Sequence, residues 1–230
     1  MLVLIIIPIS AFSQSGSYQY KKKMDPVLIS SGTGLMLTSL YLRSQTQPLD
    51  PSNLDKSGLL GVDRWVCGPE QPVFSHMSDI TLISSVLLPY FAAYQQKEKW
   101  PERRIKLLIT FEAQLLTLSI CTMIKEWVRR PRPYVYHTPG ELIPKLSSEA
   151  SRSFFSGHSS IAFCSAIAAG QMIKQSQNNA QQQTIWCVGL SLATCTSIFR
   201  ILARKHFPTD VLAGILFGSL VGYTLPEIHQ

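Results

Sequence analysis

Six apolar blocks, separated by polar and charged segments, restrict what the chain can fold into more than any other feature. The blocks are Pro26–Leu42, Ile80–Tyr94, Ile105–Ile124, Ser159–Ile173, Thr184–Leu202 and Val211–Leu225. A helix needs about 20 residues to cross a bilayer, with about 17 as the lower limit. The third and fifth blocks meet this length, and the others are shorter and carry Ser, Thr and Gly. We therefore predict an all-α fold, a six-helix transmembrane bundle, in which small residues such as Gly214, Gly218 and Gly222 allow close packing.

The composition supports a membrane protein and excludes several soluble classes. Charged residues are 15% of the 230 residues, against roughly 25% in an ordinary soluble domain. The net charge is +7, but the basic residues are scattered between apolar runs and form no stripe, so no nucleic-acid partner is expected. The expected partners are the membrane bilayer and a substrate drawn from it, and no obligate protein partner is inferred.

The N-terminal segment and the loop charges predict the topology. Met1–Phe12 is apolar, too short to span a bilayer, and similar to a signal peptide that lacks its leading basic residue. We divide the chain into a signal-like or short N-terminal tail at residues 1–23 and one membrane domain at residues 24–230. A basic cluster between the second and third blocks comprises Lys97, Lys99, Arg103, Arg104 and Lys106. Because basic loops stay in the cytoplasm, we expect a multi-pass protein of the inner (cytoplasmic) membrane.

The third block ends in a basic, proline-containing segment. Pro131 and Pro133 cannot continue a helix, so the helix is predicted to stop near Arg130. Lys125 then lies on the last turns and Arg132 lies just beyond them. We interpret Arg129 and Arg130 as ordinary basic anchors of a helix end.

Two further polar segments flank the fourth, fifth and sixth blocks. Ser156, Gly157 and His158 open the fourth block, where unpaired backbone N–H groups of a helix start favour an anion. Arg200 and His206 follow the fifth block, and Asp210, four residues after His206, begins the sixth. We expect the Asp210 carboxylate to accept a hydrogen bond from the imidazole of His206, which would leave the other ring nitrogen free as a nucleophile.

If the last four blocks cross the membrane alternately, these segments meet at one end of the bundle. Three cations (Lys125, Arg132 and Arg200), two histidines and a helix N-terminus then converge. A phosphate group is the ligand that this arrangement suits.

In three spaced motifs the sequence resembles the type 2 phosphatidic acid phosphatase (PAP2) superfamily, which also includes the vanadium haloperoxidases. The motifs are Lys125-x6-Arg132-Pro133, Phe155-Ser156-Gly157-His158 and Phe199-Arg200-x5-His206-x3-Asp210. Three motifs in the right order are a specific signal, whereas one alone would be weak. The sequence departs from the family pattern at Phe155, where the family has proline, and at Phe199, where it has serine.

The resemblance implies the chemistry. His206, oriented by Asp210, would attack phosphorus and form a phosphohistidine, and His158 would act as general acid and then as general base. The phosphate oxygens would be held by Lys125, Arg132 and Arg200 and by the backbone at Ser156 and Gly157. The active site is expected to face the periplasm or exterior.

The resemblance also implies the substrate class, a lipid phosphate or diphosphate, such as undecaprenyl diphosphate, phosphatidylglycerol phosphate, phosphatidate or a lipid A phosphate. The sequence has no Asp/Glu cluster and no Cys/His spacing that suggests a metal ligand set, so no metal and no cofactor are predicted and the hydrolysis is expected to be metal-independent. Two alternatives remain open: a vanadium-dependent haloperoxidase-like enzyme, and a non-catalytic lipid-phosphate carrier on the same scaffold.

The remaining polar residues receive structural interpretations. Glu112, inside the third block, is interpreted as a buried neutral carboxyl group or a packing contact. Ser78 and Asp79 are expected to cap the second helix. His229 is expected on the surface or in a loop.

Overall fold

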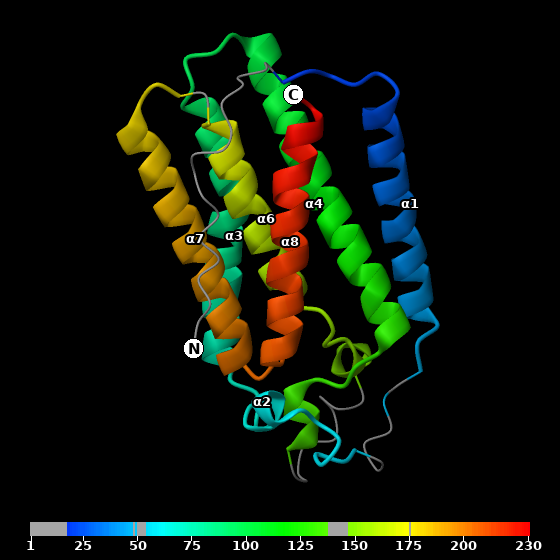
Figure 1. Ribbon diagram of the computed structural model, residues 1–230. Coiled ribbons are helices and arrows are strands. Elements are labelled where there is room, and N and C mark those ends of the chain that lie inside the picture. The colour runs from blue at the N-terminus through cyan, green and yellow to red at the C-terminus, as the bar shows by residue number, and fades with distance from the viewer. Residues whose placement is uncertain (1–17, 48, 50–53, 138–146, 175) are drawn as a thin grey trace.

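The part of the chain that the structure describes folds into a bundle of six long helices (Figure 1), so the all-α prediction is confirmed. The structure is a computed structural model that describes residues 18–47, 49, 54–137, 147–174 and 176–230. The predicted signal-like segment Met1–Phe12 lies outside the described residues. The long helices are α1 (Met24–Ser44), α3 (Pro72–Tyr94), α4 (Trp100–Val128), α6 (Gly157–Met172), α7 (Asn179–Leu202) and α8 (Pro208–Ile228). A short helix, α2 (Gly61–Arg64), and two 3₁₀ turns, η3 (Pro133–Tyr136) and η4 (Ser148–Ser151), connect them.

The second helix is longer than its apolar block, and this changes the role of its polar residues. Pro72 opens α3, and proline is favoured in the first turn because its fixed φ suits the helix and it needs no hydrogen-bond partner there. Ser78 and Asp79 therefore lie inside α3 and do not cap it, so that prediction is wrong. The apolar pattern missed this first part of the helix because polar residues, among them Ser75, His76, Ser78 and Asp79, interrupt it.

Four segments of the described chain are long and apolar enough to cross a membrane: α3, the segment Trp100–Tyr136 that contains α4, α7 and α8. The fourth predicted block, α6, has only 16 residues. It contacts α3, α4, α7 and α8, and most of its residues are buried by them. Since α6 is surrounded by protein, it can be short and carry serines without exposing them to lipid.

Glycines of α8 bring α6 and α8 into close contact. A Cβ atom on Gly218 would lie 2.0 Å from the carbonyl oxygen of Ser160, and one on Gly222 would lie 2.4 Å from that of Cys164. A Cβ atom on Gly214 would lie 2.6 Å from the carbonyl oxygen of Ser156. The four-residue spacing repeats along both helices, so the predicted small-residue packing fixes the position of the start of α6 against α8.

Different segments lie at the two ends of the bundle (Figure 1). The ends of α4 and α7 and the starts of α6 and α8 lie together at one end, with α2, η3 and η4 beside them. The opposite end carries the start of α1, the connection between α3 and α4 and the C-terminus. The basic cluster of residues 97–106 therefore lies at the end remote from the three motifs.

Candidate active site

The structure brings all three sequence motifs to one end of the bundle, as the alternating arrangement of helices requires. His206, in the turn between α7 and α8, is fully buried. Its Nδ1 lies 2.7 Å from the carbonyl oxygen of Ser153, to which it donates a hydrogen bond. Its Nε2 is buried and has no hydrogen-bond partner among the described residues. The ring therefore presents one unoccupied nitrogen, whose lone pair is available for attack on an electrophile.

The surroundings of His206 keep this nitrogen unprotonated. Burial lowers the pKa of His206 well below its ordinary value of 6.5, and the positive charges of Arg132, Lys125 and Arg200 lower it further. At neutral pH the site thus combines a neutral nucleophile with an excess of positive charge.

Asp210 is close to His206 but is not its hydrogen-bond partner, which differs from the expectation. The distance from Nδ1 of His206 to Oδ2 of Asp210 is 3.9 Å. Oδ2 accepts hydrogen bonds from the hydroxyl of Ser153 and from the backbone N–H of Phe207, 2.9 Å away. Asp210 holds the turn that carries His206, because the spacing His206-x3-Asp210 spans a helix start at which the carboxylate bonds back to the backbone.

Arg130, which we interpreted as a membrane anchor, belongs to the buried network around Asp210. Its guanidinium pairs with Oδ1 of Asp210 and with Oδ2 of Asp63, the latter at 2.9 Å. It also lies 4.3 Å from the centroid of the Phe207 ring. Asp63 in α2 in turn accepts hydrogen bonds from the backbone and the hydroxyl of Thr209. The anchor interpretation is therefore wrong for Arg130, which joins α2 to the start of α8.

Arg129 has a different environment from its neighbour. It ends α4 in the left-handed conformation, with φ of 48°. Its side chain is exposed and donates a hydrogen bond to the backbone carbonyl of Gln47 at 3.0 Å. Arg129 thus lies at the rim of this end of the bundle, as expected for a helix-end anchor.

The three predicted phosphate-binding cations have different partners. Arg132 is buried and contacts Glu149 twice, through Nε to its carbonyl oxygen and through Nη2 to its carboxylate, each at 2.8 Å. Arg200 is buried, and its Nη1 donates to the hydroxyl of Ser78 at 3.2 Å, while its Nε has no partner in the part of the chain that the structure describes. Among the residues that the structure describes, no carboxylate lies within ion-pair distance of Lys125. The group thus retains uncompensated positive charge.

Lys125 lies beside the start of α6. A Cβ atom on Gly157 would be 3.6 Å from Nζ of Lys125, so the ammonium group lies against the first turn of this helix. Ser156 caps α6, its Oγ accepting a bond from the backbone N–H of Ser159. First-turn N–H groups have no partner within the helix. A lysine side chain, a glycine and a helix N-terminus together form a place where an anion is favoured.

His158, in the first turn of α6, is paired with Asp79, which we expected to cap the second helix. Its Nε2 lies 2.9 Å from Oδ1 of Asp79 in α3. Both side chains are partly exposed to solvent, in contrast to His206. The contact joins residues 79 positions apart, and no local motif marks it.

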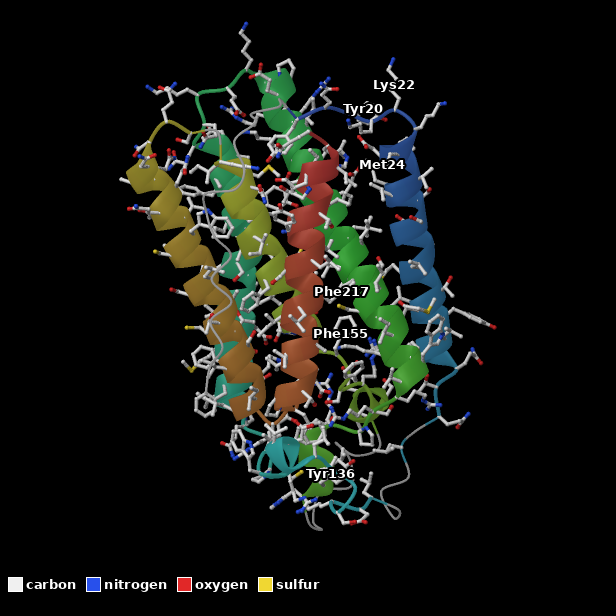
Figure 2. The ribbon with its side chains drawn as sticks, viewed as in Figure 1. Tyr20, Lys22, Met24, Tyr136, Phe155 and Phe217 are labelled. Atoms are coloured by element: carbon white, nitrogen blue, oxygen red, sulfur yellow. The ribbon has the colours of Figure 1, made fainter. Side chains whose placement is uncertain are left out.

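The two departures from the family motif are packing residues. Phe155 is buried, and its ring centroid lies 5.1 Å from that of Phe217 in α8 and 5.7 Å from that of Phe154. Figure 2 shows Phe155 and Phe217 pointing toward one another inside the bundle. Phe199 stacks on Phe74 of α3, with centroids 6.2 Å apart. Neither ring replaces a cation, a histidine or a carboxylate of the site.

Comparisons with known proteins agree with this geometry. The family model described as the PAP2 superfamily matches residues 106–230. The crystal structure of a transmembrane PAP2-type phosphatidylglycerolphosphate phosphatase from Bacillus subtilis matches with a TM-score of 0.51 and 21% sequence identity, covering 86% of this chain and 94% of that one. At this identity the match establishes the fold. No curated protein matches the chain.

Proposed function

Because the chain belongs to the PAP2 superfamily, we propose that it is an integral membrane phosphatase that releases phosphate from a lipid phosphate or diphosphate. The observation that carries the proposal is the buried imidazole of His206, whose Nε2 has no partner among the described residues and whose pKa is lowered by burial and by the charges of Arg132, Lys125 and Arg200. Such a site suits a phosphoryl group, whose transfer depends mostly on positioning and on stabilisation of negative charge.

In the proposed mechanism His206 is the nucleophile. Its Nε2 lone pair attacks phosphorus while the bond from phosphorus to the leaving oxygen breaks, which gives a phosphohistidine and a lipid alcohol or lipid phosphate. Arg132, Arg200 and Lys125, with the first turn of α6, stabilise the negative charge on the phosphoryl oxygens. The Asp210 carboxylate, 3.9 Å from the ring, stabilises the positive charge that develops on His206.

His158 moves the protons. Burial and the charge of Arg200 lower the pKa of His158, whereas the Asp79 carboxylate, which accepts a hydrogen bond from Nε2–H, and the anionic phosphate of a bound substrate favour the protonated ring. Nδ1 then gives its proton to the leaving oxygen. In the second step the neutral ring takes a proton from water, which attacks phosphorus, and the bond from phosphorus to Nε2 of His206 breaks. Phosphate is released and both histidines return to their starting states.

The location of the site supports a lipid substrate. The residues of the candidate site lie at the ends of helices that are long and apolar enough to cross a membrane, where a head group meets the bilayer surface. The Bacillus subtilis protein with this fold is named as a phosphatidylglycerolphosphate phosphatase, so this lipid belongs in the first panel of substrates, beside phosphatidate, undecaprenyl diphosphate and a lipid A phosphate.

The test is phosphate release by the detergent-purified chain in the presence of EDTA, with its folded state followed by gel filtration. We expect release by the natural chain and by a His76→Ala control, which removes an exposed histidine of α3, and none by His206→Ala. Label from radioactive substrate should be trapped on the natural chain as an acid-labile phosphohistidine. Release that persists in His206→Ala, or that stops in EDTA while the protein stays folded, would contradict the mechanism.

We also propose that this end of the bundle faces the periplasm or exterior of the inner membrane, since the basic cluster of residues 97–106 lies at the other end. Lys56, exposed beside α2, offers a labelling position. A Lys56→Cys variant should react with a membrane-impermeant maleimide in intact cells or spheroplasts, above the background of the natural chain. If Lys56→Cys reacted only with membrane-permeant maleimides, this end of the bundle would face the cytoplasm and the proposed orientation would be wrong.

A further inference from the structure

A second cluster of ionisable side chains lies at the end of the bundle remote from the candidate active site. It consists of Asp25 in the first turn of α1, Glu112 in α4 and His229 directly after α8. All three residues are buried, with at most 1% of each exposed. His229 lies in the turn after α8 but is buried, so the expectation of a surface position is wrong, and Glu112 is buried as expected and lies close to this histidine. Glu112 precedes Lys125 by 13 positions, about 20 Å along the helix axis.

The hydrogen bond that His229 makes through one ring nitrogen orients its other ring nitrogen toward the carboxylates of Asp25 and Glu112. Nδ1 of His229 donates to the carbonyl oxygen of Leu225 at 2.7 Å. Nε2 then faces Oδ1 of Asp25 at 3.0 Å and Oε2 of Glu112 at 3.5 Å. In the neutral ring this nitrogen carries a lone pair, so three electron-rich atoms face one another and require a positive charge between them.

The cluster is not balanced by a cationic side chain. Among the described residues, no lysine or arginine pairs with Asp25 or Glu112. Both carboxylate oxygens of Glu112 are buried without a hydrogen-bond partner. Since an unpaired buried charge is very unfavourable, Glu112 requires a proton or a cation beside it.

We propose that Asp25, Glu112 and His229 bind one divalent transition-metal ion, with Zn²⁺ as the expected occupant. One nitrogen and two carboxylate oxygens form a donor set that zinc accepts, whereas Mg²⁺ and Ca²⁺ prefer oxygen ligands alone. Zinc bonds of about 2.0–2.1 Å in a tetrahedral site place neighbouring ligand atoms about 3.3 Å apart. The observed separations of 3.0 and 3.5 Å lie on either side of this value, and all three atoms lie within 4.8 Å of one another.

The groups around the three ligands have the roles expected near a metal. The bond from Nδ1 of His229 to a backbone carbonyl fixes the ring and the tautomer, which is the usual arrangement for a metal-binding histidine. Oδ2 of Asp25 accepts from the backbone N–H of Lys21 at 3.0 Å, which leaves Oδ1 for the ion. The fourth position would be taken by water or by Oε1 of Glu112.

The site would hold the two ends of the domain together. The backbone N–H of Gln19 already bonds to the carbonyl oxygen of His229 at 2.8 Å. Figure 2 shows Tyr20, Lys22 and Met24, which follow Gln19 in the sequence, at this end of the bundle and far from Phe155. A metal bound by α1, α4 and the residue after α8 would therefore stabilise the fold and take no part in the proposed hydrolysis.

Metal binding by the full-length chain in detergent tests the proposal directly. The protein is stripped with EDTA, exchanged into chelator-free buffer and titrated with Co²⁺, whose visible absorption is strong when the ion is tetrahedral. We expect one Co²⁺ per chain with such a spectrum, displacement by Zn²⁺, and a higher thermal unfolding midpoint with Zn²⁺ than without it. His206→Ala should behave like the natural chain, so failure of the proposed hydrolysis would leave this result untouched.

Matched variants locate the ion. Glu112→Gln keeps the size of the side chain and removes one ligand charge, and His229→Gln removes the nitrogen ligand. Both should lose the tetrahedral spectrum and the response to Zn²⁺, while the His76→Ala control keeps them. If the natural chain gives no tetrahedral spectrum and its unfolding midpoint does not respond to Zn²⁺, the proposal is overturned and the three groups share protons. A Glu112→Gln variant that binds Co²⁺ as the natural chain does would place the ion elsewhere and overturn it equally, even if His229→Gln does not fold.

Discussion

The imidazole of His206 is held by the backbone carbonyl of Ser153, which lies 2.7 Å from Nδ1. The hydroxyl of the same serine donates to Asp210, so one residue connects the imidazole with the carboxylate. Because the contact to the ring is made by the backbone, it depends on the position of the loop before α6. The loop in turn depends on Asp210 and on Arg130, which pairs with it.

The first prediction concerns Arg130. Asp210 and Asp63 are both fully buried and both pair with this guanidinium, so Arg130→Gln leaves two buried carboxylates with less compensation. We expect the free energy of unfolding to fall by about 2–3 kcal/mol, since Arg130 itself is partly exposed, and phosphate release to fall by about 100-fold. The measurements are thermal unfolding in detergent and steady-state kinetics.

Arg129→Gln is the matched control for this prediction. The Arg129 side chain is exposed and bonds only to a backbone carbonyl in the described part of the chain, so its loss should change stability by less than about 0.5 kcal/mol. Equal effects of the two substitutions would mean that the buried network has no special role.

The second prediction concerns the pH dependence. The pKa of His206 lies well below 6.5 because of burial and then the charge of Arg132. A protonated ring cannot attack phosphorus, so activity should persist as the pH falls below 6.5 and should be lost only as the pH reaches this lowered pKa. Arg132→Gln removes one of the charges that lower the pKa, and the low-pH limb of kcat/KM should then move to higher pH.

Comparison of the two pH profiles distinguishes the ionisation of His206 from the ionisation of the substrate. The phosphate of the substrate has its own ionisation in this range, but this ionisation is the same for the natural chain and for Arg132→Gln. The shift between the two low-pH limbs therefore reports on His206. If the low-pH limb of kcat/KM lay at the same pH in both proteins, Arg132 would have no effect on the pKa of His206.

The third prediction concerns Asp79, which contacts His158 at 2.9 Å. Asp79→Asn removes a charge-assisted hydrogen bond, and about 1.4 kcal/mol of lost transition-state stabilisation corresponds to a tenfold lower kcat. KM should change little, because Asp79 does not contact the phosphate-binding cations through any bond that the described structure shows. Asp79→Glu should recover part of the rate. Asp55→Asn, which changes an exposed aspartate between α1 and α2, is the control, and a rise in KM with unchanged kcat would argue against the assigned role.

The sequence was sufficient to predict the bundle, and to predict that the candidate site residues meet at one end of it, because both depend on short-range patterns. Helical blocks are visible as apolar runs, and the motif from Arg200 through His206 to Asp210 spans only the end of α7, the following turn and the start of α8. Once the helices alternate, Lys125, Ser156 and Arg200 must meet at one end.

The partners of these residues were not predictable, since they come from distant segments. Asp63 reaches Arg130 across 67 positions, and Asp79 reaches His158 across 79. Asp79 was assigned to a helix cap because polar residues interrupt the apolar pattern of its segment, although the segment is helical. The group formed by Asp25, Glu112 and His229 spans almost the whole chain, so no ligand spacing reveals it.

The last prediction tests the packing that holds the start of α6 in place. A methyl group at Gly218 would lie 2.0 Å from the carbonyl oxygen of Ser160, a backbone atom that cannot turn aside. Gly218→Ala should therefore separate α6 from α8, lower stability by about 1–3 kcal/mol and reduce phosphate release, because the first turn of α6 carries His158. Gly34→Ala is the control: nothing lies within 4 Å of the new methyl group in α1, and the higher helix propensity of alanine should leave stability unchanged or raise it by up to about 1 kcal/mol. Thermal unfolding of both variants is the measurement. If Gly218→Ala left the stability unchanged, α6 and α8 would not pack at this distance.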